Sequence, residues 1–326
     1  MKIKCEGLFW RILILVNILI IVLGVIFFQG NTKRDYSVNQ KENAFYIGAS
    51  YMTMNNEFYK IMNEEISAKV EAEGDRFILR DPALDADRQI RQIEEMMKRG
   101  IDVLIVTPVD WKRLMPILEQ AKENGIIIIV LDTNVYNENL AYCTITSDNY
   151  NAGKVVGQYF VSQHEKAKVI VMTHKTAKSG QDRVQGFIDA VSGRKGIRIV
   201  QEIECEGQLE IAMPKLQEAI DKGIEFDHVF CLNDLAGVGV VAALEENDML
   251  DKVKVYGVDA SPDSKALIKE GMMEASAAQF PSEIGKKASE VIYQLLDGRE
   301  VDRNILVPVE LITKDNVEEF GIDRWQ

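Results

Sequence analysis

Short, continuous apolar segments recur along most of this chain, and a longer segment with helical spacing of its apolar residues follows each of them. Residues 102–107 (DVLIVT) and 126–131 (IIIIVL) show no alternation of apolar and polar side chains. A strand with one solvated face would alternate, so these strands are predicted to be covered on both faces, as in a parallel sheet. Strands that alternate with helices in this way predict right-handed βαβ units.

The alternation runs through two successive series. The first series predicts strands at 45–50, 77–79, 102–107 and 126–131 and helices at 57–73, 87–99 and 111–124. The second predicts strands at 168–172, 197–203, 228–232, 253–258 and 274–278 and helices at 181–191, 209–222, 235–247 and 262–269. Two series of similar size predict an α/β protein of two doubly wound parallel-sheet lobes, and 326 residues suffice for two cores.

Composition excludes several classes of function. The net charge of −13 argues against nucleic acid as a partner, because phosphate binding needs a basic surface. The four cysteines form no CxxC pair, and the three histidines are scattered, which leaves no set of metal ligands. No nucleophile lies beside a base. We therefore predict neither an enzyme nor a protein with a metal or other cofactor.

The first 30 residues differ from the rest. Residues 12–28 are apolar except for Asn17 and Gly24, and this length matches a membrane-spanning helix better than the shorter core of a secretory signal. Basic residues before the run favour a cytoplasmic N-terminus. We predict a signal-anchor over 1–30, a stalk over 31–43, and binding lobes outside the cell membrane. A cleaved signal peptide is the alternative.

Ligands of open α/β sheets bind beyond the carboxyl ends of the strands, so the loops that follow the predicted strands are informative. These loops contain Asn, Asp, Arg and Gln side chains with aromatic residues nearby, at 54–59, 107–111, 132–134, 181–183, 233–234, 259–261 and 279–281. A sugar explains the mixture, because its hydroxyls both donate and accept hydrogen bonds while its apolar ring face packs on aromatic rings. The loops therefore predict a site for a polyhydroxylated ligand.

An ordered set of segments carries a family resemblance. The segments are MNNEFY (54–59), RQIEEMMKRGIDVLIVTPVD (91–110), IIIIVLDT (126–133), ITSDNYNAGKVVGQY (145–159), GQDRVQGF (180–187), FCLNDLAGVGVVAAL (230–244), VYGVDASPD (255–263) and AAQFPSEIGKKA (277–288). Over residues 44–312 the chain resembles type I periplasmic sugar-binding proteins of the ribose/xylose/galactose group. That resemblance implies two lobes joined by three crossings, with a monosaccharide between them.

The resemblance also implies where the lobes divide. Crossings are expected near 146–148, 279–280 and 308–309. The N-terminal lobe would then comprise 44–147 plus 280–308, and the C-terminal lobe 148–279 plus 309–326.

Ligand contacts carry over from the family at eight positions. They are Asn56, Phe58, Tyr59, Asp132, Arg183, Asn233, Asp259 and Gln279. Thr133 stands where ribose binders have an arginine, and Gly207 where they have an aromatic residue, so the resemblance favours another pentose such as xylose. Tyr51, Trp111 and Thr133 are expected at the edge of the cleft.

Several of these residues also have purely structural interpretations. Asn56 and Asn233 are residue types that cap helices, and Asp259 could cap the helix that starts at Pro262. Arg183 could lie on a helix surface. The cysteines Cys143, Cys205 and Cys231 are expected to be small core residues, and Asp85 a helix cap.

Two roles stay open for a sugar-binding protein with such an anchor. The chain resembles membrane-anchored xylose-type binding proteins that associate with LytS-type sensor histidine kinases. This likeness implies a receptor that passes its signal to a two-component system, in a 2:2 complex with the kinase. The alternative is the substrate-binding subunit of a sugar ABC importer, whose partner is a permease.

Overall fold

The computed structural model describes residues 43–326, and these form two six-stranded sheets with helices packed on them. The predicted anchor over 1–30, and all but the last residue of the predicted stalk, lie outside the described residues. Within 43–326, no helix combines the length and the apolar character that crossing a membrane requires.

The first sheet is parallel throughout, with strand order β11-β5-β4-β3-β1-β2. Its strands are β1 (Tyr46–Ser50), β2 (Arg76–Arg80), β3 (Val103–Val106), β4 (Ile127–Leu131), β5 (Cys143–Ser147) and β11 (Asn304–Val307). The helices of this half are α2 (Glu57–Ala72), α3 (Ala86–Lys98), α4 (Met115–Glu123) and α10 (Pro281–Leu296). We call this sheet and its helices the first lobe.

The second sheet repeats the same winding, with order β12-β10-β9-β8-β6-β7. Its strands are β6 (Ala167–Thr173), β7 (Ile197–Glu204), β8 (His228–Cys231), β9 (Lys254–Asp259), β10 (Ala275–Ala278) and β12 (Glu310–Thr313). Its helices are α5 (Asn149–Gln163), α6 (Lys178–Val191), α7 (Leu209–Asp221), α8 (Asp234–Glu246) and α9 (Pro262–Glu270). Strand β12 runs antiparallel to β10, whereas the other pairings are parallel. We call this half the second lobe.

The continuous apolar runs form the sheet interiors, as the sequence predicts. All four residues of β3 and of β8 are buried, because helices cover both faces of the sheet. Each lobe has its own apolar core, one around Leu104 and Ile129 and the other around Phe187 and Phe230. The predicted two-lobed α/β fold with parallel sheets is confirmed.

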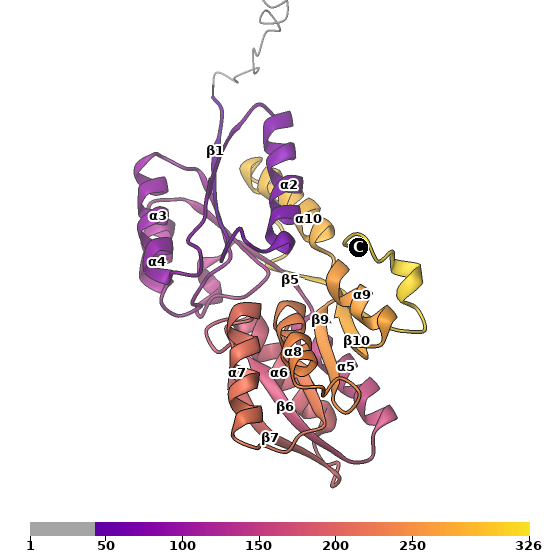
Figure 1. The fold of residues 1–326 in the computed structure, drawn as a ribbon. Helices are drawn as coiled ribbons and strands as arrows, with labels where there is room; N and C mark the ends of the chain where they lie inside the picture. Colours follow the sequence, from indigo (N-terminus) through magenta and orange to yellow (C-terminus); the bar gives the residue numbers. More distant parts are fainter. Residues whose placement is uncertain (1–42) are drawn as a thin grey trace, which may run out of the picture. The chain divides into compact units, whose positions relative to one another are not determined.

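The chain passes between the two sheets more than once. After β10 it returns to the first lobe, where α10 packs against α2, and Figure 1 shows these two helices side by side although their sequences are far apart. It then leaves β11 for β12 in the second sheet. Short hydrogen bonds also join the lobes, since the Ser179 amide donates to Thr133 Oγ1 at 2.8 Å and the Trp111 amide to the Thr176 carbonyl at 3.2 Å.

One predicted helix begins later than expected. The helix predicted over 111–124 starts at Met115, because Asp110 instead accepts the amides of Lys112 and Arg113 and closes a turn. Pro116 then occupies the first helical turn, where its missing amide costs nothing. The prediction of a helix from Trp111 was therefore wrong by one turn.

Candidate functional site

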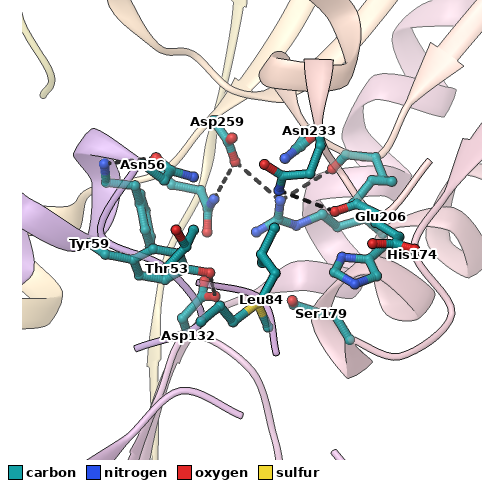
Figure 2. A pocket seen from close by; sticks show the side chains of 17 residues that line it. Thr53, Asn56, Tyr59, Leu84, Asp132, His174, Ser179, Glu206, Asn233 and Asp259 are labelled. Carbon is teal, nitrogen blue, oxygen red and sulfur yellow. Dashed lines mark hydrogen bonds and ion pairs between the residues drawn. The ribbon is translucent and has the colours of Figure 1, made fainter. Parts of the chain in front are cut away.

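A pocket lies between the lobes at the carboxyl ends of their strands, and Figure 2 shows side chains from both lobes around it. All eight residues predicted to contact a ligand line this pocket: Asn56, Phe58, Tyr59, Asp132, Arg183, Asn233, Asp259 and Gln279. They come from strand ends and helix starts that are separated by up to 223 positions in the sequence, from 56 to 279. Parallel winding brings them together because equivalent strand ends meet at the same edge of each sheet.

Arg183 is the centre of the second-lobe half of the pocket. Its side chain is 5% exposed and donates from Nε to Asn149 Oδ1 at 2.8 Å. Its Nη1 donates to the Leu232 carbonyl at 3.2 Å and forms an ion pair with Asp259 Oδ1 at 3.1 Å. The interpretation of Arg183 as a surface helix residue was therefore wrong. Three bonded partners fix one guanidinium in place.

Asp259 completes this network. It accepts from Gln279 Nε2 at 2.5 Å as well as from Arg183, and burial raises the pKa of its carboxyl while Arg183 opposes that rise. Ser261, not Asp259, caps the helix at Pro262. The alternative of a capping role for Asp259 was wrong, because its carboxylate faces the arginine.

A second buried carboxylate, Asp234, lies behind Asp259 and outside the pocket lining. It accepts from the Ser261 amide at 2.8 Å and from Ser276 Oγ at 2.7 Å, and also from Ser264 Oγ. Burial, and then the charge of Asp259, raise its pKa to about 7.

Two aromatic rings form one wall of the first-lobe half of the pocket. Phe58 and Tyr59 open α2 and meet edge to face with ring centroids 5.6 Å apart. Tyr51 stacks on Tyr59 from behind at 6.0 Å. These rings offer an apolar wall of the kind that packs on the C–H face of a sugar.

Asp132 is the charged group of this half. It follows β4 with φ of +67°, a conformation that favours glycine, and the Tyr59 hydroxyl donates to its Oδ2 at 3.1 Å. Burial raises the pKa of this carboxyl to about 6, although Arg183 pulls it down. Asp259 also has a positive φ, of +127°. Strained backbone of this sort persists where the surroundings fix it, and it clusters at functional sites.

Asn56 and Asn233 serve as helix caps while they line the pocket. Asn56 Oδ1 accepts from the Phe58 amide at 3.0 Å, and Asn233 Oδ1 accepts from the Ala236 amide at 3.1 Å. Asn233 Nδ2 also donates to the Gly207 carbonyl at 2.9 Å. The capping interpretation is confirmed for both residues, and it fixes the direction of each side chain.

The three residues expected at the cleft edge do not line the pocket. Tyr51 is fully buried behind Tyr59, and Thr133 Oγ1 accepts from the Ser179 amide. The ring of Trp111 packs against Tyr136 at 5.3 Å. Each side chain is thus engaged with protein rather than with the pocket.

Nine lining residues were not singled out from the sequence: Met52, Thr53, Leu84, His174, Ala177, Ser179, Glu206, Gln208 and Leu232. His174 directly follows β6, so the strand-end rule could have found it. Burial and the nearby Arg183 lower its pKa to about 4, which leaves it uncharged at neutral pH. Leu84 belongs to the loop between β2 and α3 and carries no sequence signal of this kind.

The cysteines of the described residues do not line this pocket. Cys143, Cys205 and Cys231 are buried and free, as expected for small core residues. Asp85 caps α3 by accepting from the Arg88 amide at 2.9 Å. Across residues 43–326, no group of three or more His, Cys, Asp or Glu side chains could hold a metal ion.

The segment 321–326 packs against both lobes near the pocket. Trp325 meets Phe58 of the first lobe with centroids 5.6 Å apart. Gln326 Nε2 donates to the carbonyls of Asp259, Ala260 and Gln279 at 3.1, 3.3 and 2.9 Å. The buried Lys265 donates in turn to the Arg324 carbonyl at 2.6 Å and to Gln326 Oε1 at 2.9 Å. The segment thus braces the backbone that carries Asp259 and Gln279.

Two doubly wound lobes with a buried polar pocket between their strand ends define a two-lobed α/β binding protein. The chain belongs to the periplasmic binding protein domain family, whose model matches residues 47–300.

Known proteins resemble this chain along most of its length. It is 25% identical over 284 residues to the ribose import binding protein RbsB of Bacillus subtilis (strain 168), a match that covers 86% of this chain and 91% of the relative. An ABC transporter solute binding protein from Mycobacterium smegmatis with bound glycerol superposes with a TM-score of 0.81 at 27% identity, covering 87% and 100% of the two chains.

A third similar protein is an ABC transporter solute binding protein from Bacillus halodurans C-125 with bound myo-inositol. It superposes with a TM-score of 0.80 at 25% identity, and the match covers 86% of this chain and 98% of the other. These relatives are all named as binding proteins, and the prediction that the chain is not an enzyme is confirmed.

Proposed function

We propose that the protein binds a polyhydroxylated molecule of monosaccharide size between its lobes, outside the cytoplasmic membrane. The observation that carries this proposal is the convergence of all eight predicted contact residues on one pocket. The aromatic pair Phe58 and Tyr59 supplies a wall for a ring face, and Arg183, Asp259 and Gln279 supply fixed donors and acceptors for hydroxyls. Relatives named for ribose import or solved with myo-inositol support a ligand of this class.

Within that class, the resemblance favours a pentose such as xylose over ribose. Thr133 replaces the arginine of ribose binders, and its hydroxyl accepts from Ser179 instead of facing the pocket. One guanidinium therefore remains among the residues that line the pocket, which is Arg183. A pocket with one guanidinium is expected to select an arrangement of ligand hydroxyls that differs from the one in ribose.

The favoured role is that of the substrate-binding subunit of an ABC importer. Relatives that are named as an import binding protein and as ABC transporter solute binding proteins support it. In this role a membrane permease is the partner.

The second role is that of a membrane-anchored receptor for a LytS-type sensor histidine kinase. The apolar run at 12–28 favours it, because a fixed single-pass anchor would hold the lobes beside a membrane partner. Ligand-driven closure of the lobes could bias a kinase only through a difference in the affinities of the open and closed forms for it. A 2:2 assembly with the kinase is the arrangement that we propose for this role.

A thermal-shift screen against pentoses, hexoses, inositols and their epimers tests the ligand class. A ligand at a hundred times its Kd should add about 2.7 kcal/mol of stability. For a chain of this size each kcal/mol raises the Tm by roughly 2–4 °C. One compound that raises the Tm while its epimers do not supports the proposal, and the absence of any shift, both across the panel and across its amino-substituted derivatives, would overturn it.

Cross-linking in membranes followed by mass spectrometry separates the two roles. Recovery of permease subunits supports the importer, whereas recovery of a histidine kinase supports the receptor. A shortened protein that lacks residues 1–30 is the control, since the receptor role needs the anchor and the pocket does not.

A further inference from the structure

The charges that line the pocket do not balance. Asp132 and Asp259 are 4% and 5% exposed, and they face one buried cation, Arg183. His174 adds no positive charge at neutral pH, because burial and Arg183 lower its pKa to about 4. The exposed Glu206 at the same pocket adds further negative charge. A buried carboxylate without a cation is costly, so the imbalance needs an explanation.

The unbalanced carboxylate is that of Asp132. Asp259 has both the Arg183 guanidinium and the Gln279 amide as donors. Asp132 receives one side-chain hydrogen bond, from the Tyr59 hydroxyl, and forms no ion pair among residues 43–326. The two carboxylates therefore differ in their partners. Asp259 is paired with a cation, and Asp132 is not.

An independent feature shows the same excess of acceptors. Gln279 is 2% exposed and lines the pocket, and its amide nitrogen is used by Asp259. Its Oε1 atom is buried and has no partner among the described residues. A ligand hydroxyl has one proton to donate, whereas an ammonium group has three and also carries the missing charge.

We propose that the ligand carries a positively charged amino group that pairs with Asp132, which makes it an amino sugar or an aminocyclitol rather than a neutral polyol. This inference rests on the proposed function, in that it takes the pocket to hold a polyhydroxylated molecule. The ring packs against Phe58 and Tyr59, its hydroxyls bond to Arg183 and Asn233, and the ammonium group lies against Asp132.

Matched pairs of probes test the proposal by calorimetry at pH 7.5. The pairs are glucosamine with glucose, galactosamine with galactose, 2-amino-2-deoxyxylose with xylose, and an amino-deoxyinositol with myo-inositol. We expect at least one amine to bind ten-fold or more tightly than its hydroxyl parent. Parents that all bind as well as their amines, or better, would overturn the proposal while leaving the proposed function intact. If neither amines nor parents bind, the proposed function itself fails and this inference fails with it.

Two variants locate the charge that is recognised. Asp132→Asn keeps the shape of the side chain and should weaken amine binding by a hundred-fold or more, with less than a five-fold effect on a parent polyol. Asp87→Asn is the matched control, because it removes the same charge from an exposed position of α3 outside the pocket lining, and a change of less than three-fold is expected. Equal losses for amine and parent in Asp132→Asn would contradict the proposal.

A pH series on the unmodified protein covers the case in which Asp132→Asn does not fold. The groups that act on Asp132 are Tyr59 from α2, Arg183 from α6 and Asp259 at the end of β9, and His174 and Glu206 line the same pocket. Burial and the Asp132 carboxyl hold the pKa of Tyr59 well above its usual range, and the pKa of His174 lies near 4. Because burial raises the pKa of Asp132 to about 6, amine affinity should fall several-fold more than parent affinity over this range. A parallel pH dependence for amine and parent would overturn the proposal.

Discussion

The two lobes contribute unlike halves to one pocket. The second lobe supplies Arg183, Asp259 and Gln279, which bond to one another and to Asn149 and leave Gln279 Oε1 without a partner among the described residues. The first lobe supplies the rings of Phe58 and Tyr59 and one carboxylate, Asp132, which one hydroxyl contacts. The difference teaches that the charges of the second-lobe half are paired within the protein, whereas the first-lobe half leaves a charge for the ligand to satisfy.

The largest expected effect comes from breaking the second-lobe network. Arg183→Met leaves Asp259 as a buried charge without its cation, which should lower the free energy of unfolding by about 3–5 kcal/mol. Ligand binding should be lost as well. Chemical denaturation and calorimetry measure the two effects.

The control for this variant is Arg183→Lys, which keeps the positive charge but loses the planar guanidinium group with its several N–H donors. It should retain more stability than Arg183→Met and still bind ligand poorly. Equal stability of Arg183→Met and the parent protein would show that the network is not the organising element of this half.

The next effect concerns the helix contact that places Arg183. A Cβ atom at Gly153 of α5 would lie 1.7 Å from the Arg183 carbonyl oxygen, so Gly153→Ala must push α5 and α6 apart. We expect a loss of about 1–3 kcal/mol in unfolding free energy together with weaker ligand binding. The first-lobe counterpart is Gly285→Ala, whose Cβ would lie 2.8 Å from the Met62 carbonyl oxygen between α10 and α2. It should cost less, and a larger cost than that of Gly153→Ala would reverse the comparison.

Asp132 of the first lobe and Asp234 of the second lobe are buried carboxyls, and the pH dependence of stability allows the two lobes to be compared through them. Asp132 has a folded pKa of about 6 and Asp234 one of about 7, both above their ordinary value. Each carboxyl therefore binds its proton more tightly in the folded state than in the unfolded state. Its contribution to the free energy of unfolding is present in full below about pH 4 and is lost as the pH rises through the folded pKa. Replacing either residue by Asn should remove that loss, by about 1–3 kcal/mol.

Denaturant melts between pH 4 and pH 8 measure these contributions. The difference between the parent protein and Asp132→Asn should change mainly between about pH 4 and 6, and the difference for Asp234→Asn should extend to about pH 7. A flat difference for Asp132→Asn would mean that its carboxyl is not effectively buried.

The smallest expected effect concerns the 321–326 segment. Gln326→Ala removes one amide that three carbonyls of the second lobe share, which should cost about 1 kcal/mol and lower the Tm by roughly 2–4 °C. Trp325→Ala removes the contact with Phe58 on the first lobe. We expect Gln326→Ala to weaken binding through Asp259 and Gln279, and Trp325→Ala through the aromatic wall. Unchanged affinity in both variants would show that the segment does not support the pocket.

Much of this fold follows from local sequence patterns. The apolar runs predicted β3, β4 and β8 because strands covered on both faces leave no polar alternation. The strand-end rule, together with the family resemblance, identified eight residues that the structure brings to one pocket. These predictions depend on short-range periodicity and on a topology shared by both halves.

Other features depend on contacts that the sequence does not encode locally. The ion pair between Arg183 and Asp259 joins residues that are 76 positions apart, and the helical periodicity around Arg183 does not by itself distinguish it from a surface residue. Tyr51 and Thr133 follow strands closely, yet their side chains face protein rather than the pocket. Side-chain direction at a strand end is set by backbone geometry and by packing from the other elements, so position alone could not separate these residues from Asp132.

Trp325 and Trp111 allow the two lobes to be followed by tryptophan fluorescence. The indole of Trp325 lies against Phe58 at the pocket wall, and the backbone of Trp111 bonds to Thr176 across the boundary between the lobes. Indole emission responds to the polarity and packing of its surroundings, so both residues act as natural fluorophores beside the contacts that movement of the lobes would change. Replacing each tryptophan in turn by phenylalanine would assign the emission change to one side of the molecule, and ligand capture could then be followed in real time without a label.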